Sequence, residues 1–155
     1  MPNWIKGTLK LRGKTENIIS FLQNGVHCYL YTNDGYVPVD REKWCQEYHD
    51  ENYHEFIIKD LAHIDGTNRA FIEEQEISFE TGCIAVIDFR QAWEYDADQF
   101  VDIAKKYNLD IRAYGIESGM QFIQEFEIIN NKTTMKKQIK YVDWDWECPF
   151  PRMGG

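Results

Sequence analysis

The sequence lacks the short motifs that mark the common enzyme classes. It contains no GxSxG nucleophile motif, no GxGxxG or GxxxxGK[ST] phosphate-binding loop, no EF-hand spacing and no CxxC pair. These motifs position a nucleophile, cradle phosphates or gather metal ligands, so their absence removes the usual routes to catalysis. No residue is singled out as catalytic, and no cofactor or metal is expected. The sequence therefore predicts a binding protein rather than an enzyme.

Long apolar runs are also missing. No stretch of 18 apolar residues exists, and the first residues contain no apolar segment of the kind found in signal peptides. The four cysteines (Cys28, Cys45, Cys83 and Cys148) show no spacing typical of a secreted disulfide framework. We therefore expect a cytoplasmic protein with free thiols and no membrane partner.

Basic residues are few: 17 Lys and Arg stand against 26 Asp and Glu, for a formal net charge of −9. Non-specific nucleic-acid binding depends on neutralising phosphates, so direct binding to nucleic acid is not expected. The charge suits a basic protein partner or a surface that imitates nucleic acid, and it equally suits a merely soluble acidic protein. With 155 residues, 43% of them hydrophobic, the chain fits one folded domain.

Periodicity predicts an α+β fold. Strands are expected at 5–12, 53–59, 62–64, 70–79, 83–89, 109–116, 120–129 and 137–147; helices near 15–24 and 96–108, with a short surface helix within 40–51; and a hairpin around Asn33-Asp34-Gly35. The ferredoxin-like arrangement is the simplest antiparallel fold with this order. It would form a single domain over 1–155, with inserted hairpins and an acidic segment at about 28–80.

Several stretches carry a resemblance to a known family. The opening Met1-Pro2-Asn3-Trp4, the segment 66–72, the pair Ala92-Trp93 and the ending 146–155 resemble small bacteriophage and mobile-element proteins with a YubB-like ferredoxin-like domain. Ile5 departs from the family pattern, which usually has Cys there. The resemblance implies the ferredoxin-like fold and a phage or prophage origin, and hence the cytoplasm of a bacterial host. It implies no activity, and no functional residue can be carried over from it.

The segment 40–60 is the densest acidic region and also holds aromatic residues. Aromatics anchor protein interfaces and charges steer the encounter, so we expect a partner-binding surface there. Its candidate residues are Glu42, Trp44, Glu47, Tyr48, Asp50 and Glu51. The partner would be a host protein with a basic surface, and the sharpest form of the hypothesis is inhibition of a host defence system such as a CRISPR nuclease. The alternative is a solvated face with no partner.

Two further functions stay open. A cleft lined by Trp4, His63, Arg69, Trp93 and Tyr95 would suit a small molecule or nucleotide, with the arginine holding a phosphate. A structural or assembly role in a phage particle is the other, and the sequence does not predict the oligomeric state.

Two groups of residues could in principle bind a metal, but a structural interpretation is favoured for both. Cys45, His49 and His54 are close in sequence, yet a structural zinc site needs four ligands. Asp143, Asp145 and Glu147 alternate with Trp144 and Trp146 and could hold Mg²⁺ or Ca²⁺, but on a strand this pattern equally gives an acidic outer side and two buried tryptophans.

Overall fold

The computed structural model describes residues 1–155 and has an α+β architecture built on antiparallel sheets. The largest sheet has eight strands, and every neighbouring pair in it is antiparallel. In spatial order these strands are β13 (Lys132–Lys140), β12 (Phe122–Ile129), β11 (Asp110–Glu117), β1 (Trp4–Arg12), β10 (Ala85–Ala92), β8 (Ala70–Ile72), β7 (Ala62–Ile64) and β2 (Val26–His27).

Strand β1 lies near the middle of this sheet, as its alternating pattern predicts. Ile5, Leu9 and Leu11 are fully buried, whereas Lys10 and Arg12 are exposed. Gly7 faces Gly115 across the β1–β11 ladder, and a Cβ atom at position 7 would lie 1.8 Å from a backbone oxygen of β11. Only glycine therefore permits this close approach of the two strands.

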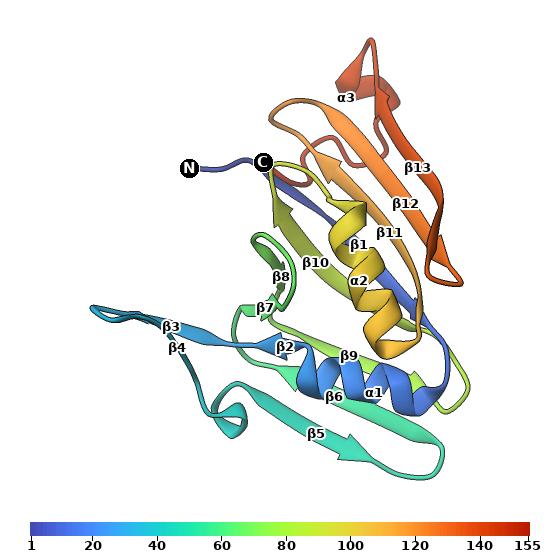
Figure 1. Ribbon diagram of the computed structural model, residues 1–155. Coiled ribbons are helices and arrows are strands. Elements are labelled where there is room, and N and C mark those ends of the chain that lie inside the picture. Colours follow the sequence, from blue (N-terminus) through green and yellow to red (C-terminus); the bar gives the residue numbers. More distant parts are fainter.

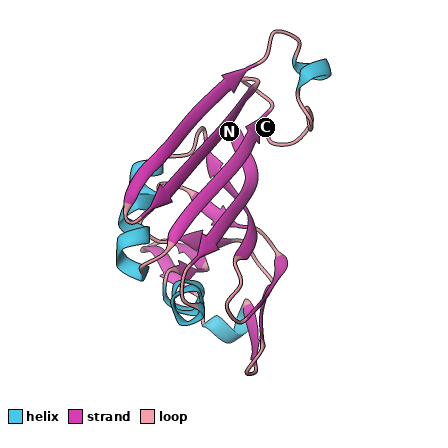
Figure 2. Ribbon diagram, turned by 90° about the vertical axis from the view of Figure 1, so that its right-hand side faces the viewer, coloured by secondary structure: helices cyan, strands magenta, loops and turns pink.

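Two longer helices each pack against one of the sheets. Helix α1 (Thr15–Asn24) follows β1, and α2 (Ala97–Tyr107) connects β10 to β11. Figure 2 shows α2 on one side of the large sheet, and Figure 1 shows α1 lying across the smaller sheet described below. Both helices were predicted from their apolar periodicity. No helix in the structure combines the length and the apolar character needed to cross a bilayer.

A three-stranded sheet replaces the surface helix expected within 40–51. Its strands are β5 (Cys45–His49), β6 (Tyr53–Ile58) and β9 (Gln75–Glu80). Only the 3₁₀ turn η1 (Arg41–Lys43) is helical in that region, so the helix prediction was wrong. Pairing of β5 with β6, in a register that sets His49 opposite His54, outweighs the local preference of a polar segment.

The strand expected over 70–79 is divided between two sheets. β8 belongs to the large sheet, and β9 belongs to the small one. The chain changes sheets at Glu73 and Glu74, where neither residue is in a strand. A composition rich in strand-forming residues therefore predicted the strands but not the break between them.

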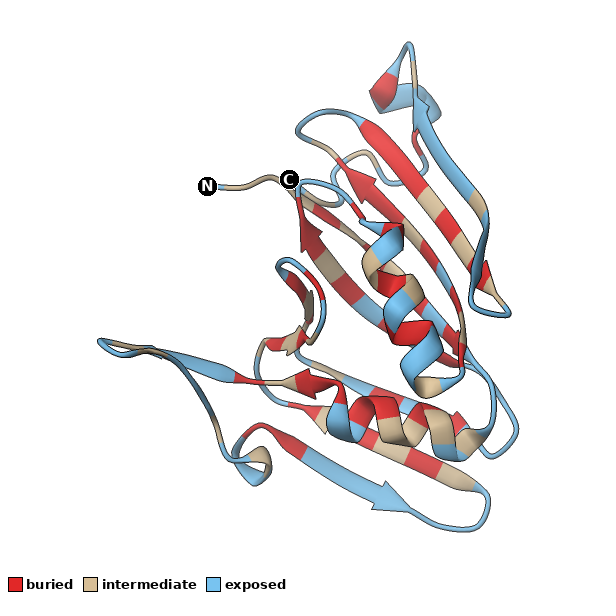
Figure 3. Cartoon of the chain, in the orientation of Figure 1, coloured by how far each residue is buried: buried red, intermediate tan, exposed pale blue.

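The hairpin predicted around Asn33-Asp34-Gly35 is present, formed by β3 (Tyr29–Thr32) and β4 (Gly35–Pro38). It forms a sheet of its own and projects from the body of the molecule (Figure 1). Figure 3 shows that most of it is exposed.

The strand expected over 137–147 was wrong in its second half. β13 ends at Lys140, and a short helix, α3 (Trp144–Glu147), follows it. The Asp143 carboxylate accepts a hydrogen bond from the backbone N–H of Trp146, which caps this helix. Trp144 is buried, but Trp146 is 86% exposed, so the two tryptophans do not share a buried side.

One hydrophobic core joins the two larger sheets. A single cluster of 32 buried residues includes Leu9 of β1, Phe100 of α2, Phe21 of α1 and Phe56 of β6. The strands inserted between α1 and β8 therefore pack onto the same core as the large sheet, apart from the projecting hairpin.

Candidate functional site

The acidity of the chain is concentrated in the small sheet. Residues 45–58 and 75–80, which comprise β5, β6, β9 and the β5–β6 turn, contain six acidic residues and no Lys or Arg. They therefore account for most of the net charge of −9, and the other 135 residues are nearly neutral. Two thirds of the net negative charge is therefore located in this sheet and its β5–β6 turn.

One side of the small sheet presents tyrosines and carboxylates to solvent. We call the outward residues Tyr48, Tyr53, Glu55, Glu76 and Glu80 the tyrosine–carboxylate face. They alternate with His54, Phe56, Ile77 and Phe79, which are buried against the core. The ladders set Tyr48 opposite Glu55 and Tyr53 opposite Glu80, so each ring lies beside a carboxylate of the next strand.

Hydrogen bonds hold these rings in place. The Tyr53 hydroxyl donates to Glu55 at 2.9 Å, and the Tyr48 hydroxyl donates to Asp50 at 3.2 Å. Asp50 also accepts the backbone N–H groups of Asn52 and Tyr53, at 2.8 and 2.7 Å, and so closes the β5–β6 turn. These two backbone bonds, together with the Tyr48 hydroxyl, lower the pKa of Asp50, whereas the bond to Asp50 raises the pKa of Tyr48.

The residues predicted for partner binding have separate locations. Trp44 is only 2% exposed; its indole N–H donates to the Val39 carbonyl, and the Arg41 guanidinium lies over its ring. Glu47 bonds Gln23 and Arg41 beside α1. Neither belongs to the tyrosine–carboxylate face.

The other four predicted residues are exposed. Glu42 lies in η1, Tyr48 is on the tyrosine–carboxylate face, and Asp50 and Glu51 lie at the β5–β6 turn. The six predicted residues did not include the face residues contributed by β6 and β9. The period-two alternation within 53–58 and 75–80 is the signal that could have identified them.

The projecting hairpin carries large apolar side chains without a covering layer. Leu30, Tyr31, Tyr36 and Val37 are all exposed, Tyr31 by 78%. Tyr31 and Tyr36 are register partners whose ring centres lie 5.4 Å apart. An isolated two-stranded hairpin is marginally stable in water, so contact with another surface would stabilise this one.

Three of the residues predicted for a small-molecule cleft lie near one another. The guanidinium of Arg69 is 5.5 Å from the centre of the Trp4 ring, and that of Arg90 is 4.4 Å from it. The Phe71 ring bridges Trp4 and His63, with centre-to-centre distances of 6.0 and 5.4 Å. Trp4, His63 and Phe71 are half-buried.

The remaining two cleft candidates, Trp93 and Tyr95, lie in different environments. Trp93 is exposed. Its backbone N–H donates to the carbonyl of Asn3, the residue before Trp4, at 2.8 Å. Tyr95 instead lies in the core, where it stacks on Phe89 with ring centres 4.6 Å apart, and burial raises its pKa well above the ordinary value. Tyr95 therefore cannot line a ligand site together with Trp4.

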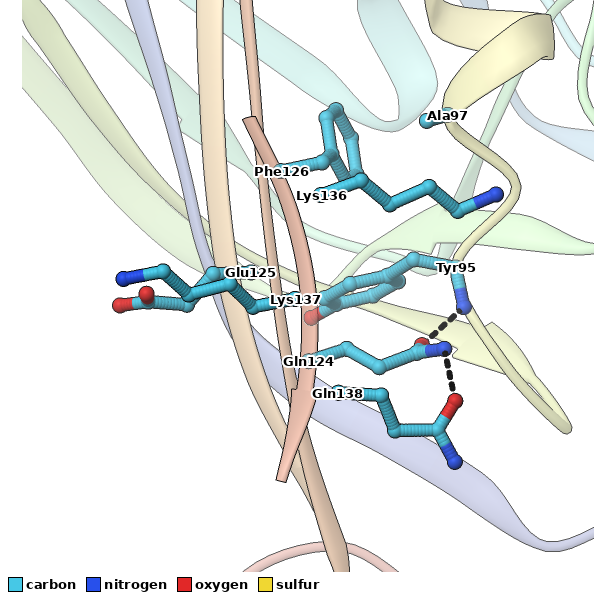
Figure 4. A pocket seen from close by; sticks show the side chains of 8 residues that line it. All are labelled: Tyr95, Ala97, Gln124, Glu125, Phe126, Lys136, Lys137 and Gln138. Carbon is cyan, nitrogen blue, oxygen red and sulfur yellow. Dashed lines mark hydrogen bonds between the residues drawn. The ribbon is translucent and has the colours of Figure 1, made fainter. Parts of the chain in front are cut away.

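The cavity beside Tyr95 is too small for a ligand. It measures about 30 Å³, which is room for about one water molecule. Figure 4 shows the surrounding network: the Tyr95 N–H donates to Gln124 at 2.8 Å, and the Gln124 amide donates to Gln138 at 3.4 Å. These bonds join the β10–α2 connection to β12 and β13, so the role of this region is structural.

No group of three or more His, Cys, Asp or Glu side chains in the structure could hold a metal ion. Within the group considered from the sequence, the Nδ1 atoms of His49 and His54 lie 3.1 Å apart, and His54 also bonds the Thr81 hydroxyl. Cys45 begins β5, opposite Ile58, at the other end of the ladder from this histidine pair. Comparisons with protein families, curated proteins and solved structures found no match to this chain.

Proposed function

We propose that this chain is a binding protein whose hairpin and tyrosine–carboxylate face together engage a protein with an apolar pocket beside a basic surface. The observation that carries this proposal is the placement of six acidic residues, with no Lys or Arg, in the small sheet and its β5–β6 turn, which η1 connects to the exposed apolar hairpin. Charge complementarity specifies a basic partner, and exposed apolar side chains specify a pocket.

The two surfaces have different roles in this proposal. Tyr31 and Tyr36 at the hairpin, with Leu30 and Val37, act as anchors, since burying a large apolar side chain contributes roughly 1.5–3 kcal/mol. The carboxylates steer the encounter, because complementary charge mainly raises the association rate. Tyr48 and Tyr53 add contact area at low entropic cost, since a tyrosine side chain has few rotatable bonds.

The partner that best suits such a surface is a protein that itself binds nucleic acid. A groove lined by Lys and Arg attracts any array of negative charges, including carboxylates on a neighbouring protein. We therefore propose a host component as the target, with inhibition of a host defence nuclease as the sharpest version. A phage or mobile-element origin, which the opening residues suggest, would provide a reason for such an inhibitor.

We also infer a ferredoxin-like core from the strand order. Helix α1 lies between β1 and β8 in the chain, and α2 lies between β10 and β11. In the sheet, β10 separates β1 from β8, and β1 separates β10 from β11. Two interleaved βαβ units of this kind support the ferredoxin-like assignment, with β2–β7 and β9 as insertions and β12–β13 as an extension.

The test combines capture from a bacterial lysate with three variants of the full chain. Tyr31→Ser/Tyr36→Ser removes the anchors, Glu55→Lys/Glu76→Lys/Glu80→Lys reverses the face, and Trp146→Ser is the control at an exposed tryptophan near the far end of the chain. Any captured protein is purified, and its binding is then measured against each variant at low and high salt.

We expect the control to bind like the parent chain. The hairpin variant should dissociate faster, and the charge-reversed variant should associate roughly ten-fold more slowly and lose its salt dependence. A captured protein that binds both variants as tightly as the parent chain would rule out this interface.

A further inference from the structure

The corner of the large sheet around Trp4 adjoins the projecting hairpin only through Tyr29 of β3, which is not among the proposed anchor residues. Two residues there hold a backbone conformation that side-chain-bearing residues rarely adopt: φ is 56° at Arg69 and 71° at Trp93. Most other non-glycine residues with positive φ are asparagines, which tolerate it. For a bulky residue such as tryptophan this conformation is a genuine outlier.

The strained residues are tied to one another and to the start of β1. The Ala92 N–H donates to the Arg69 carbonyl at 3.2 Å, and the Trp93 N–H donates to the Asn3 carbonyl at 2.8 Å. Both strained side chains are exposed, Trp93 by 59%. Packing in the core therefore does not require an arginine or a tryptophan at these positions. Strain retained at exposed side chains is typical of functional sites.

Positive charge collects at this corner. Arg69 and Arg90 lie over the Trp4 ring, and Lys6, the register partner of Arg90, is on the same side of β1 as Trp4. Glu73 is the acid that pairs there, at 3.4 Å from Lys6 and 3.5 Å from Arg90. Arg69 has no carboxylate within 4.0 Å. The Nε atom of Arg90 is buried and forms no hydrogen bond, so the protein does not satisfy every donor of this guanidinium.

A row of rings extends from the charged corner across the sheet. It runs from Trp4 through Phe71 and His63 to Tyr29, and successive ring centres lie 5.4–6.0 Å apart. These rings come from β1, β8, β7 and β3, and none of them is fully buried. Successive rings meet edge to face, with interplanar angles of 68°, so a flat heterocycle can stack on one ring of the row at a time.

We propose that this corner binds a mononucleotide, with the phosphate at Arg69 and Arg90 and the base on the ring of Phe71, the register partner of Arg90. A guanidinium is suited to bidentate phosphate binding, and stacking on a protein ring is open to any base. One phosphate fits better than a chain of them, because Arg69 is the cation without a paired acid and the net charge of −9 repels polyanions.

Isothermal titration calorimetry of the full chain tests the proposal with four probes: adenosine monophosphate, adenosine, inorganic phosphate and a short oligodeoxyadenylate. We expect saturable one-to-one binding of the monophosphate, with adenosine and phosphate each weaker by roughly ten-fold or more. Absence of saturable binding at millimolar monophosphate would overturn the proposal. Tighter binding of the oligonucleotide, by roughly ten-fold, would also overturn it and assign the platform to single strands.

The strained backbone offers a variant that separates binding from folding. Arg69→Gly removes the guanidinium and relieves the positive φ, so it should raise Tm while weakening monophosphate binding by roughly ten-fold. Arg112→Ala removes an arginine of the same sheet that pairs with Glu127, and binding should be unchanged. Equal losses in the two variants, or full binding by Arg69→Gly, would show that Arg69 does not hold the ligand.

Discussion

The side chain of Gln75 takes the place of a missing strand beside Asp88. Its Nε2 donates to the Asp88 carbonyl at 2.7 Å, and its Oε1 accepts from the Asp88 N–H at 2.9 Å. Strand β8 pairs with β10 only as far as Phe89, so without Gln75 the backbone N–H and C=O of Asp88 would have no hydrogen-bond partner on that edge of β10. The amide therefore links the small sheet to the large one.

Removing this link should destabilise the protein. Gln75→Ala loses both bonds to Asp88 and should lower the free energy of unfolding by about 1–3 kcal/mol. Gln75→Glu keeps the acceptor but turns a carboxylate toward the Asp88 carbonyl, so its loss should be at least as large. Urea denaturation measures both, with the exposed Gln46→Ala of β5 as the control. Equal stability of Gln75→Ala and the control would show that the link contributes nothing.

The tryptophans at 44 and 146 should behave in opposite ways. Trp44 is buried in the core, so Trp44→Ala should cost about 3–5 kcal/mol of stability. Trp146 is exposed, and Trp146→Ala should change stability by about 0.5 kcal/mol or less. Chemical denaturation followed by circular dichroism checks both. A Trp44→Ala protein as stable as the parent chain would show that burial of this ring contributes little to the fold.

Asp50 should contribute to the pH dependence of stability. Its pKa in the folded protein is lowered, chiefly by two backbone N–H groups, so its stabilising effect is complete above the range in which an unfolded aspartate titrates, about pH 4. The effect is lost as pH falls through the lowered pKa. Asp50→Asn should therefore be less stable than the parent chain at pH 7, and the difference should shrink as the solution becomes more acidic.

Denaturation over a pH series measures that difference. Asp34→Asn, at the tip of the hairpin, removes the same charge from a carboxylate with no hydrogen bond to the fold and is the matched control. If both variants show the same pH dependence, overall charge rather than the turn at Asp50 is responsible.

Thiol reactivity should distinguish one cysteine from the other three. Cys83 is exposed, whereas Cys28, Cys45 and Cys148 are buried and none forms a disulfide. Burial also raises the pKa of the Cys28 and Cys45 thiols, which lowers the fraction of reactive thiolate. A thiol reagent should label one site quickly in the native protein and four after unfolding. Cys83→Ser should abolish the fast phase, and a fast phase that survives this change would contradict the burial of the others.

Elements with a strong local pattern were predictable from sequence. Strand β1, helix α2 and the hairpin around Asp34-Gly35 each have a period or a turn signal that few other structures satisfy. For the same reason the alternation along β1 already indicated that Leu9 and Leu11 are buried. The concentration of acidic residues near 40–60 was equally visible, because composition requires no knowledge of contacts.

The composition of the candidate sites depended on contacts between distant residues. Trp44 and Tyr48 are four residues apart, yet one is in the core and the other on the surface, because Trp44 ends the turn η1 before β5 begins, whereas Tyr48 lies on the outer side of β5 opposite Glu55. Likewise, Arg69 meets Trp4 because β10 holds β1 and β8 together in the sheet.

Sequence by itself determined an acidic α+β protein, with most of its strands, both long helices and its apolar hairpin. Tertiary structure alone decided that β5 is a strand, that 70–79 divides between two sheets, and which side chains share a face. The physical reason is the distance along the chain over which each signal acts. Periodicity depends on neighbours a few residues apart, whereas strand pairing joins residues far apart in the chain, and its free energy outweighs weak local preferences.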